Sequence, residues 1–272
     1  MTFISPSSPV ENYFVLSSGR TGTTYLTGLL RSAAAEIDCF QEPFPGWFFQ
    51  IMSNLSAAGQ LPLGLQHFAK SVFIAYRQHL KKKCVTSKLV EVNPFLYGLA
   101  PLISHASQPF HLIHMVRHPF GYICSMLNFK PGGLKNLFFH SRLWNPTLAG
   151  VAGLTATEWT HLHPVLQKAW LWLFINRQIA GSQSLALSYH LLRFEDLCHS
   201  EPEKRSETLT QIAVWLDLKN CRLDTIDPQG LSRNASRERN PHGAQLLSPY
   251  LKSAIRRICR PLMEQFGYQD TE

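Results

Sequence analysis

The fold is decided by residues 13–24, Tyr13-Phe14-Val15-Leu16-Ser17-Ser18-Gly19-Arg20-Thr21-Gly22-Thr23-Thr24. The first four residues form a short apolar run that predicts a buried strand, and the Ser-Ser-Gly that follows ends this run. Beyond the polar segment, Thr23–Ala35 carries apolar residues at helical spacing. A strand, a polar glycine loop and a helix in this order are typical of the opening unit of a nucleotide-binding α/β fold.

The rest of the chain continues this alternation. Further strands are expected at Val85–Val90, Phe110–Val116 and Leu185–Arg193. Further helices are expected at Pro119–Leu127, Pro164–Ala180, Ser206–Leu216 and Ser248–Phe266. The pattern predicts a three-layer, P-loop-like α/β fold with a mostly parallel central sheet flanked by helices. A length of 272 residues suits one large domain spanning residues 1–272. Gly46–Leu65 and Pro131–Glu158 are less regular, and we expect loops that cover a ligand.

The segment Ser17–Thr24 is a candidate anion-binding loop. Its backbone N–H groups, together with the positive end of the following helix, could converge on one anion. An ordinary Ser/Thr/Gly turn that caps the helix is the alternative. When the triphosphate-binding pattern GxxxxGK[ST] is laid on the loop, Thr23 stands where the lysine belongs. The cation here is Arg20, which favours a ligand other than ATP or GTP.

A second candidate anion site begins at Arg117, in Met115–Pro119 at the expected end of a strand. Open α/β sheets bind ligands at the carboxyl ends of their strands, and a guanidinium can bind phosphate through two hydrogen bonds. Ser125 follows Arg117 by eight positions. Taken alone, the two residues are equally compatible with an ordinary strand-end arginine and a serine inside a helix.

The two segments together resemble the donor-binding motifs of sulfotransferases that use 3′-phosphoadenosine 5′-phosphosulfate (PAPS). The loop, continued by Tyr25-Leu26, is most similar to the carbohydrate-type and bacterial branch. The resemblance implies that PAPS is the donor and that adenosine 3′,5′-bisphosphate (PAP) is the product. It assigns the 5′-phosphosulfate to the loop and the 3′-phosphate to the second site. The donor-binding residues would be Ser18, Gly19, Arg20, Thr21, Gly22, Thr23, Thr24, Arg117 and Ser125. Arg20 would also be catalytic, because it would neutralise charge on the bridging oxygen.

Glu42 is the candidate general base. It precedes Pro43 at the expected end of a second strand, and a carboxylate there could take the proton of an acceptor hydroxyl, a contribution of roughly 10²–10⁴ in rate. The resemblance supports this role, because the carbohydrate-type branch has a base before a proline in this region. Glu91 is a rival, since a charge at an apolar strand end needs a partner, which we expect to be Arg20 or the substrate.

Other residues near the motifs have weaker signals. His114 and His118 flank Arg117, and a histidine is the base in other branches of the family, although core packing is the more ordinary role. Leu192–Leu197 resembles a family element in which Arg193 and Glu195 would brace the nucleotide site. Arg233–Arg237 lies where family members close over the 3′-phosphate. Two tryptophans are expected in the core, with stacking on adenine as the alternative: Trp170 and Trp172.

Composition narrows the choice of partners. The formal net charge of +8 is compatible with a polyanionic ligand, while the single tight basic run, Lys81–Lys83, favours a solvated face over nucleic-acid binding. The six cysteines have no metal-site spacing, so no metal is expected. The chain has neither a leader pattern nor an apolar segment of about 18 residues, so we expect a cytoplasmic protein without a membrane span.

The acceptor is expected to be a small molecule or a carbohydrate, with the aromatic stretch Phe44–Phe49 as a candidate platform. Two alternatives to a sulfotransferase remain at this point. One is a small-molecule kinase of the P-loop type, and the other is a non-catalytic nucleotide-binding protein.

Overall fold

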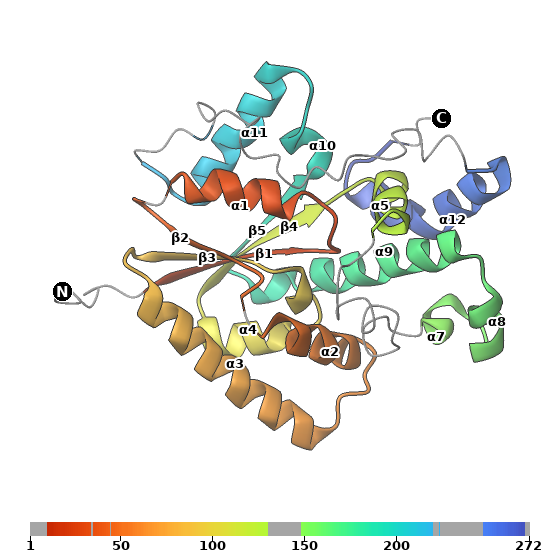
Figure 1. The fold of residues 1–272 in the computed structure, drawn as a ribbon, viewed down its shortest axis with the longest axis horizontal. Coiled ribbons are helices and arrows are strands. Elements are labelled where there is room, and N and C mark those ends of the chain that lie inside the picture. The colour runs from red at the N-terminus through yellow and green to blue at the C-terminus, as the bar shows by residue number, and fades with distance from the viewer. Residues whose placement is uncertain are drawn as a thin grey trace.

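The computed structural model describes residues 10–33, 35–43, 45–129, 148–219, 223 and 247–269. Within these ranges the core is a five-stranded sheet in the order β2-β3-β1-β4-β5, and every neighbouring pair is parallel (Figure 1). The strands are β1 (Glu11–Ser17), β2 (Asp38–Gln41), β3 (Lys88–Val92), β4 (Phe110–Val116) and β5 (Ser188–Arg193). The α/β fold predicted from the sequence is therefore confirmed.

Helices cover both faces of this sheet (Figure 1). On one face lie α1 (Thr23–Arg31) and α11 (Pro202–Trp215), with the short α10 (Phe194–Leu197) following β5. The other face is covered by α2 (Gly46–Ala57), α3 (Leu63–Lys83), α4 (Ala100–Ser107) and α9 (Pro164–Gly181). Beyond the carboxyl ends of the strands, α5 (Pro119–Leu127) and α12 (Pro249–Gln265) pack on α9. The remaining short helices are η1 (Pro94–Leu96), α7 (Ala149–Ala152), α8 (Ala156–His161) and η2 (Gln183–Leu185).

β1 is the middle strand and is buried on both sides. Phe14 and Leu16 enter the core under α2, α3 and α9, while Tyr13 and Val15 enter the core under α1 and α11. A strand that buries both faces needs an apolar residue at every position rather than at alternate ones. This requirement explains the continuous apolar run that precedes the loop.

Some element boundaries agree with the sequence pattern and others do not; α11, for example, begins at Pro202 rather than at Ser206. β4 and α5 begin and end where they were predicted. The strand predicted at Val85–Val90 instead spans Lys88–Val92, because Val85 is exposed and the backbone N–H of Thr86 donates to the Asp38 side chain. Of the strand predicted at Leu185–Arg193, residues 185–187 are likewise excluded, because β5 begins at Ser188.

The irregular structure expected for Gly46–Leu65 is wrong, because α2 fills most of it and α3 begins at Leu63. Pro45 and Gly46 suggested a loop, yet they start a helix. A Cβ on Gly46 would lie 2.9 Å from the Phe95 ring, so the glycine serves close packing rather than a turn. Of Pro131–Glu158, residues 149–152 and 156–158 are helical, and residues 131–147 lie outside the described part of the chain.

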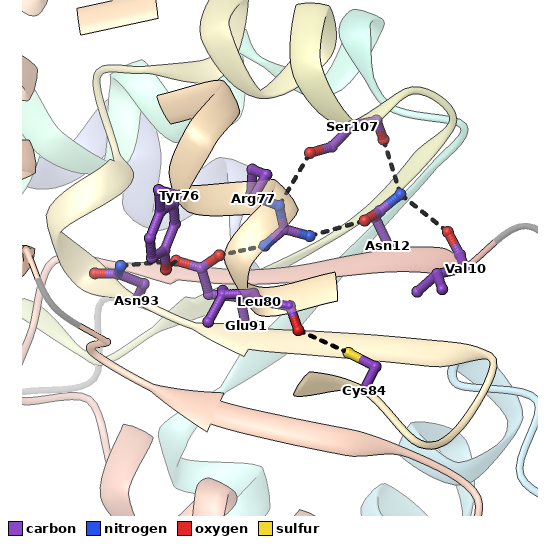
Figure 2. Close-up of polar contacts among 9 residues, drawn as sticks. All are labelled: Val10, Asn12, Tyr76, Arg77, Leu80, Cys84, Glu91, Asn93 and Ser107. Atoms are coloured by element: carbon purple, nitrogen blue, oxygen red, sulfur yellow. Dashed lines mark hydrogen bonds and ion pairs between the residues drawn. The ribbon is translucent and has the colours of Figure 1, made fainter. Parts of the chain in front are cut away.

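A buried polar network fastens α3 to the sheet (Figure 2). Arg77 of α3 and Glu91 of β3 form an ion pair whose side chains are 1% and 0% exposed. Glu91 also accepts from Tyr76 Oη at 2.6 Å and from Asn93 Nδ2 at 2.8 Å. Arg77 donates further to Asn12 Oδ1 at 2.8 Å and to Ser107 Oγ at 3.1 Å. Both charges are thus saturated with hydrogen bonds, which is the condition under which a buried ion pair is tolerated.

We expect Glu91→Leu to lower the free energy of unfolding by about 3–5 kcal/mol, because Arg77 would be left as an uncompensated buried cation. The double variant Glu91→Leu/Arg77→Met removes both charges and should recover most of this loss. Urea unfolding followed by circular dichroism measures both values. If Glu91→Leu lowered the free energy of unfolding by less than about 1 kcal/mol, which is the cost of losing one ordinary hydrogen bond, this account of the network would be wrong.

Candidate functional site

The parallel register of β1 and β4 brings the two predicted anion sites together. Ser17 pairs with Met115, so the loop after β1 and the segment after β4 leave the sheet side by side. Arg117 donates from a terminal guanidinium nitrogen to the carbonyl oxygen of Arg20 at 3.2 Å. Arg20 in turn donates from Nε to Ser125 Oγ at 3.1 Å. Residues about 100 positions apart in the chain therefore form one connected group.

The loop has an unusual backbone conformation. Gly19, Arg20 and Gly22 have φ angles of 76°, 55° and 86°, in the left-handed region. This region is easy for glycine but costs energy for arginine. Gly22 has a second reason to be glycine, because a Cβ there would lie 2.7 Å from the Phe194 ring. At Gly19 a Cβ would meet no atom within 4 Å, so this side of the loop faces open space.

The polar groups of the loop are suited to hold an anion. No side chain caps the first turn of α1, and that turn has no acidic residue. The hydroxyls of Ser18 and Thr21 are buried without a hydrogen-bond partner, a rare state in proteins. Thr24 Oγ1 accepts from Gln41 Nε2 at 2.8 Å, which leaves the Thr24 proton available to donate. The loop thus offers amides and hydroxyls to a ligand in addition to the Arg20 side chain.

Two guanidinium groups concentrate positive charge here. Burial is the main cause that lowers the pKa of Arg20, and the positive charge of the neighbouring Arg117 lowers it further. The Arg20 guanidinium lies 4.8 Å from the centre of the Phe129 ring, and that of Arg117 lies 4.3 Å from the centre of the Phe194 ring. A Cβ on Gly121 would lie 3.0 Å from Arg117 Nε, so the glycine makes room for this side chain. The mutual repulsion of the two cations means that an anion between them would be bound favourably.

Glu42 lies one residue beyond the end of β2, at the same carboxyl edge of the sheet. Its N–H donates to Val92 O at 3.0 Å, and its φ of 41° is again left-handed. Its side chain is exposed, and the preceding residue, Gln41, reaches the loop through Thr24. Among the described residues other than glycine, φ is positive at Arg20, Glu42 and Asp217. Strained backbone of this kind is often found at functional sites.

The expectation that Glu91 pairs with Arg20 or touches substrate is wrong. Its carboxylate is fully buried and pairs with Arg77 of α3. The sequence did indicate that this charge needed a partner, but the partner lies on a helix whose place on the sheet depends on the tertiary fold. Glu91 is therefore a structural residue, and Glu42 is the exposed carboxylate of the two.

His114 is also part of the core. The ring is fully buried, with Nδ1 2.7 Å from Tyr189 Oη and Nε2 3.0 Å from Asn176 Oδ1. Because Asn176 Nδ2 donates to Trp172 O, its Oδ1 faces His114 and accepts from Nε2. Burial lowers the pKa of His114 to about 4, so the ring is neutral near pH 7.

The residues around Arg117 hold the turn between β4 and α5 in place. Glu195 accepts from the His118 N–H at 2.9 Å and from Tyr268 Oη at 2.8 Å, so it braces this turn, and its role at a nucleotide site stays a prediction. Arg193 instead pairs with Asp196 at 2.7 Å. Trp172 is buried, and its Nε1 donates to Arg117 O at 2.9 Å, as a core residue would. Trp170 is partly buried against the core, and residues 233–237 lie outside the described ranges.

Three contributors to the site were missed in the sequence. Gln41 was overlooked beside Glu42, although a polar residue at a strand end can reach a neighbouring loop. The Phe194 ring contacts the Arg117 guanidinium and also packs closely against Gly22. Gly121 lies in the helix after Arg117, and a glycine inside a helix was the available signal that something packs closely there.

Two further findings concern the described ranges only. Groups of three or more His, Cys, Asp or Glu side chains that could hold a metal ion do not occur among these residues. No helix in this part of the chain is both long and apolar enough to cross a membrane.

Comparison with known proteins finds similarity among solved structures. Neither a scan against models of protein families nor a search of curated protein sequences finds a match. Among solved structures, the chain is similar to the sulfotransferase domain from the olefin synthase of Synechococcus PCC 7002. The TM-score is 0.50, 100% of each chain is covered, and 16% of residues are identical. This likeness shows that the chain has the fold of a sulfotransferase domain.

The pKa of His114 makes stability depend on pH. The ring binds a proton at about pH 4 in the folded state and at about 6.5 when unfolded, so below pH 6.5 the unfolded state binds more protons. We expect the free energy of unfolding to fall by about 2 kcal/mol from this group between pH 7 and pH 5. Urea unfolding at both pH values should show a smaller fall in His114→Gln than in the exposed control His79→Gln. Equal falls in the two variants would contradict the assignment.

Proposed function

We propose that this protein is a sulfotransferase that moves a sulfuryl group from PAPS to an acceptor hydroxyl. The observation that carries the proposal is the contact chain from Arg117 to Arg20 and from Arg20 to Ser125. This chain of contacts joins the loop after β1, with its backbone N–H groups, to a second cationic site after β4. PAPS carries its 5′-phosphosulfate and its 3′-phosphate on one ribose, so it requires two anion sites close together. ATP has no 3′-phosphate, and the loop lacks the lysine that binds a triphosphate.

The residues present are suited to this donor. The 5′-phosphosulfate would enter at the open side of Gly19. It would be held by the unpartnered hydroxyls of Ser18 and Thr21 and by the uncapped N–H groups at the start of α1. Arg117 and Ser125 would hold the 3′-phosphate. PAPS supplies the sulfuryl group, and PAP leaves with the bridging oxygen.

The chemical step needs a base and a group that stabilises the leaving charge. Glu42 would take the proton of the acceptor hydroxyl as its oxygen forms a bond to sulfur. Arg20 would stabilise the negative charge that grows on the bridging oxygen as the sulfur–oxygen bond breaks, assisted by the Thr23 and Thr24 hydroxyls. Positioning and fixed positive charge carry such a transfer, as they do in phosphoryl transfer. The donor motif is most similar to the carbohydrate-type branch, and we therefore propose a carbohydrate or glycolipid hydroxyl as the acceptor.

Thermal unfolding with PAP tests the donor assignment. A ligand at about 100 times its dissociation constant adds about 2.7 kcal/mol, which for a chain of this size raises Tm by several degrees. We expect PAP to raise Tm, with adenosine 5′-phosphate much less effective. Arg117→Ala should weaken PAP binding at least about tenfold, because it removes charge-assisted hydrogen bonds. A shift with ATP and Mg²⁺ alone would favour a kinase, and no shift with any nucleotide would contradict nucleotide binding.

Steady-state kinetics separate the two catalytic roles from donor binding. Glu42→Gln should lower kcat by about 10²–10⁴ while PAP binding is kept, since the base does not contact the nucleotide. Arg20→Ala should lower kcat by about 10²–10³ at saturating donor. Glu207→Gln, an exposed change on α11, is the matched control. Full activity of Glu42→Gln would transfer the role of base to another residue, and full activity of Arg20→Ala would remove its catalytic role.

A further inference from the structure

The hairpin of α2 and α3 exposes a group of large apolar side chains. Trp47 is 56% exposed, Phe68 56%, Leu63 74% and Leu65 41%. We call these four residues the apolar tip. Trp47 and Phe68 both contact Phe48, so these two exposed side chains belong to one apolar patch. Exposed apolar patches often mark a binding site.

The rings of the tip are held in place from beneath. Trp47 meets Phe48 edge-on with ring centres 6.3 Å apart, and Phe48 meets Phe68 edge-on at 5.9 Å. Phe48 also packs on the buried Phe49, at 5.6 Å, and Phe49 packs on Phe73 at 5.5 Å. The exposed rings are therefore the outer end of an aromatic stack that reaches the core. A surface fixed in this way binds a partner at a lower entropic cost than mobile side chains would.

The tip lies in an uncharged part of the chain. Residues 43–69 contain no Asp, Glu, Lys or Arg, whereas the chain average of 16% charged residues predicts about four in such a stretch. Residues 58–60 and 62–68 are exposed, so the missing charges are missing from the surface. Protein partners usually meet a polar rim around an apolar centre. The exposed stretch carries Gln60, Gln66 and His67 but no Asp, Glu, Lys or Arg, and its apolar side chains are well matched to hydrocarbon.

The first turn of α2, which carries Trp47, follows the proposed base closely in the chain. α2 begins at Gly46, four residues after Glu42. Glu42 is fixed to the end of β3 through Val92 O, and Gly46 is packed against Phe95, three residues further along the chain. The proposed base and the first turn of α2, which carries Trp47, are thus anchored to the same short segment.

We propose that the acceptor is an alcohol that carries an alkyl chain, and that this chain packs along Trp47, Phe48 and Phe68 while the hydroxyl lies at Glu42. This inference rests on the proposed function and narrows its acceptor class to amphiphiles. The uncharged aromatic row supplies the affinity for the chain. The polar carboxyl edge of the sheet receives the head group.

Binding of n-alkyl β-glucosides tests the inference with one head group and a variable chain. Methyl, butyl, hexyl and octyl glucoside are titrated by calorimetry below their micelle concentrations, with PAP present. We expect affinity to rise by about two- to fourfold per methylene, where fourfold corresponds to full burial. Phe68→Gln and Trp47→Gln should flatten this dependence, whereas Val214→Gln, 71% exposed on α11, should keep it. Circular dichroism melting verifies that each variant is folded.

Three outcomes would overturn the inference. Affinity that does not depend on chain length is one, and an unchanged dependence in Phe68→Gln is another. The third is that the tip serves assembly or membrane binding instead. In that case the protein self-associates in light scattering or binds phosphatidylcholine vesicles, Phe68→Gln abolishes this behaviour, and glucoside binding shows no chain-length effect. The PAP melting shift is recorded in parallel. Its absence would contradict the proposed function, whereas the glucoside series would still decide whether the tip binds alkyl chains.

Discussion

The pairing of β1 with β4 in parallel register is the constraint on which the site depends. With Ser17 opposite Met115, the loop after one strand and the turn after the other must emerge together at the carboxyl edge. A slip by one residue would turn the side chains of β1 to the opposite faces of the sheet. A slip would therefore move Phe14 and Leu16, and likewise Tyr13 and Val15, out of the cores in which they pack on opposite faces of the sheet, and this packing specifies the register. The contact of Arg117 with Arg20 follows from it.

The site stores unfavourable terms that a ligand could relieve. Arg20 combines a left-handed backbone, partial burial and a cationic neighbour, and Ser18 and Thr21 have hydroxyls without partners. Each feature costs stability in the folded protein alone, and the packing of β1, α1 and Phe194 maintains them together. An anion in the loop would satisfy hydroxyls and cations at once.

The elements that carry the proposed donor site could be placed from the sequence because their determinants are local. A loop between strand and helix binds an anion through consecutive backbone amides, and the Arg117 segment is a strand end followed by Pro119 at a helix start, so β4 and α5 were located to the residue. Prediction failed where the deciding contact is distant in sequence. The role of Glu91 depends on Arg77 of α3, which no local pattern connects with β3. Likewise, Gly46 suggested a loop, because the local sequence does not show the Phe95 ring, 49 positions away, that packs against this glycine.

The acceptor side is built from these distant contacts. The Arg77–Glu91 pair fixes α3 on the sheet (Figure 2). Through Phe73, α3 supports Phe49, which packs on Phe48, and these rings hold the apolar tip. The same strand end that carries Glu91 also receives the backbone of Glu42 through Val92. One buried ion pair thus connects the proposed base with the surface proposed to bind the alkyl chain. A change in helix packing would alter the proposed acceptor surface and leave the proposed donor loop in place, because the loop is held by β1 and β4 rather than by α3.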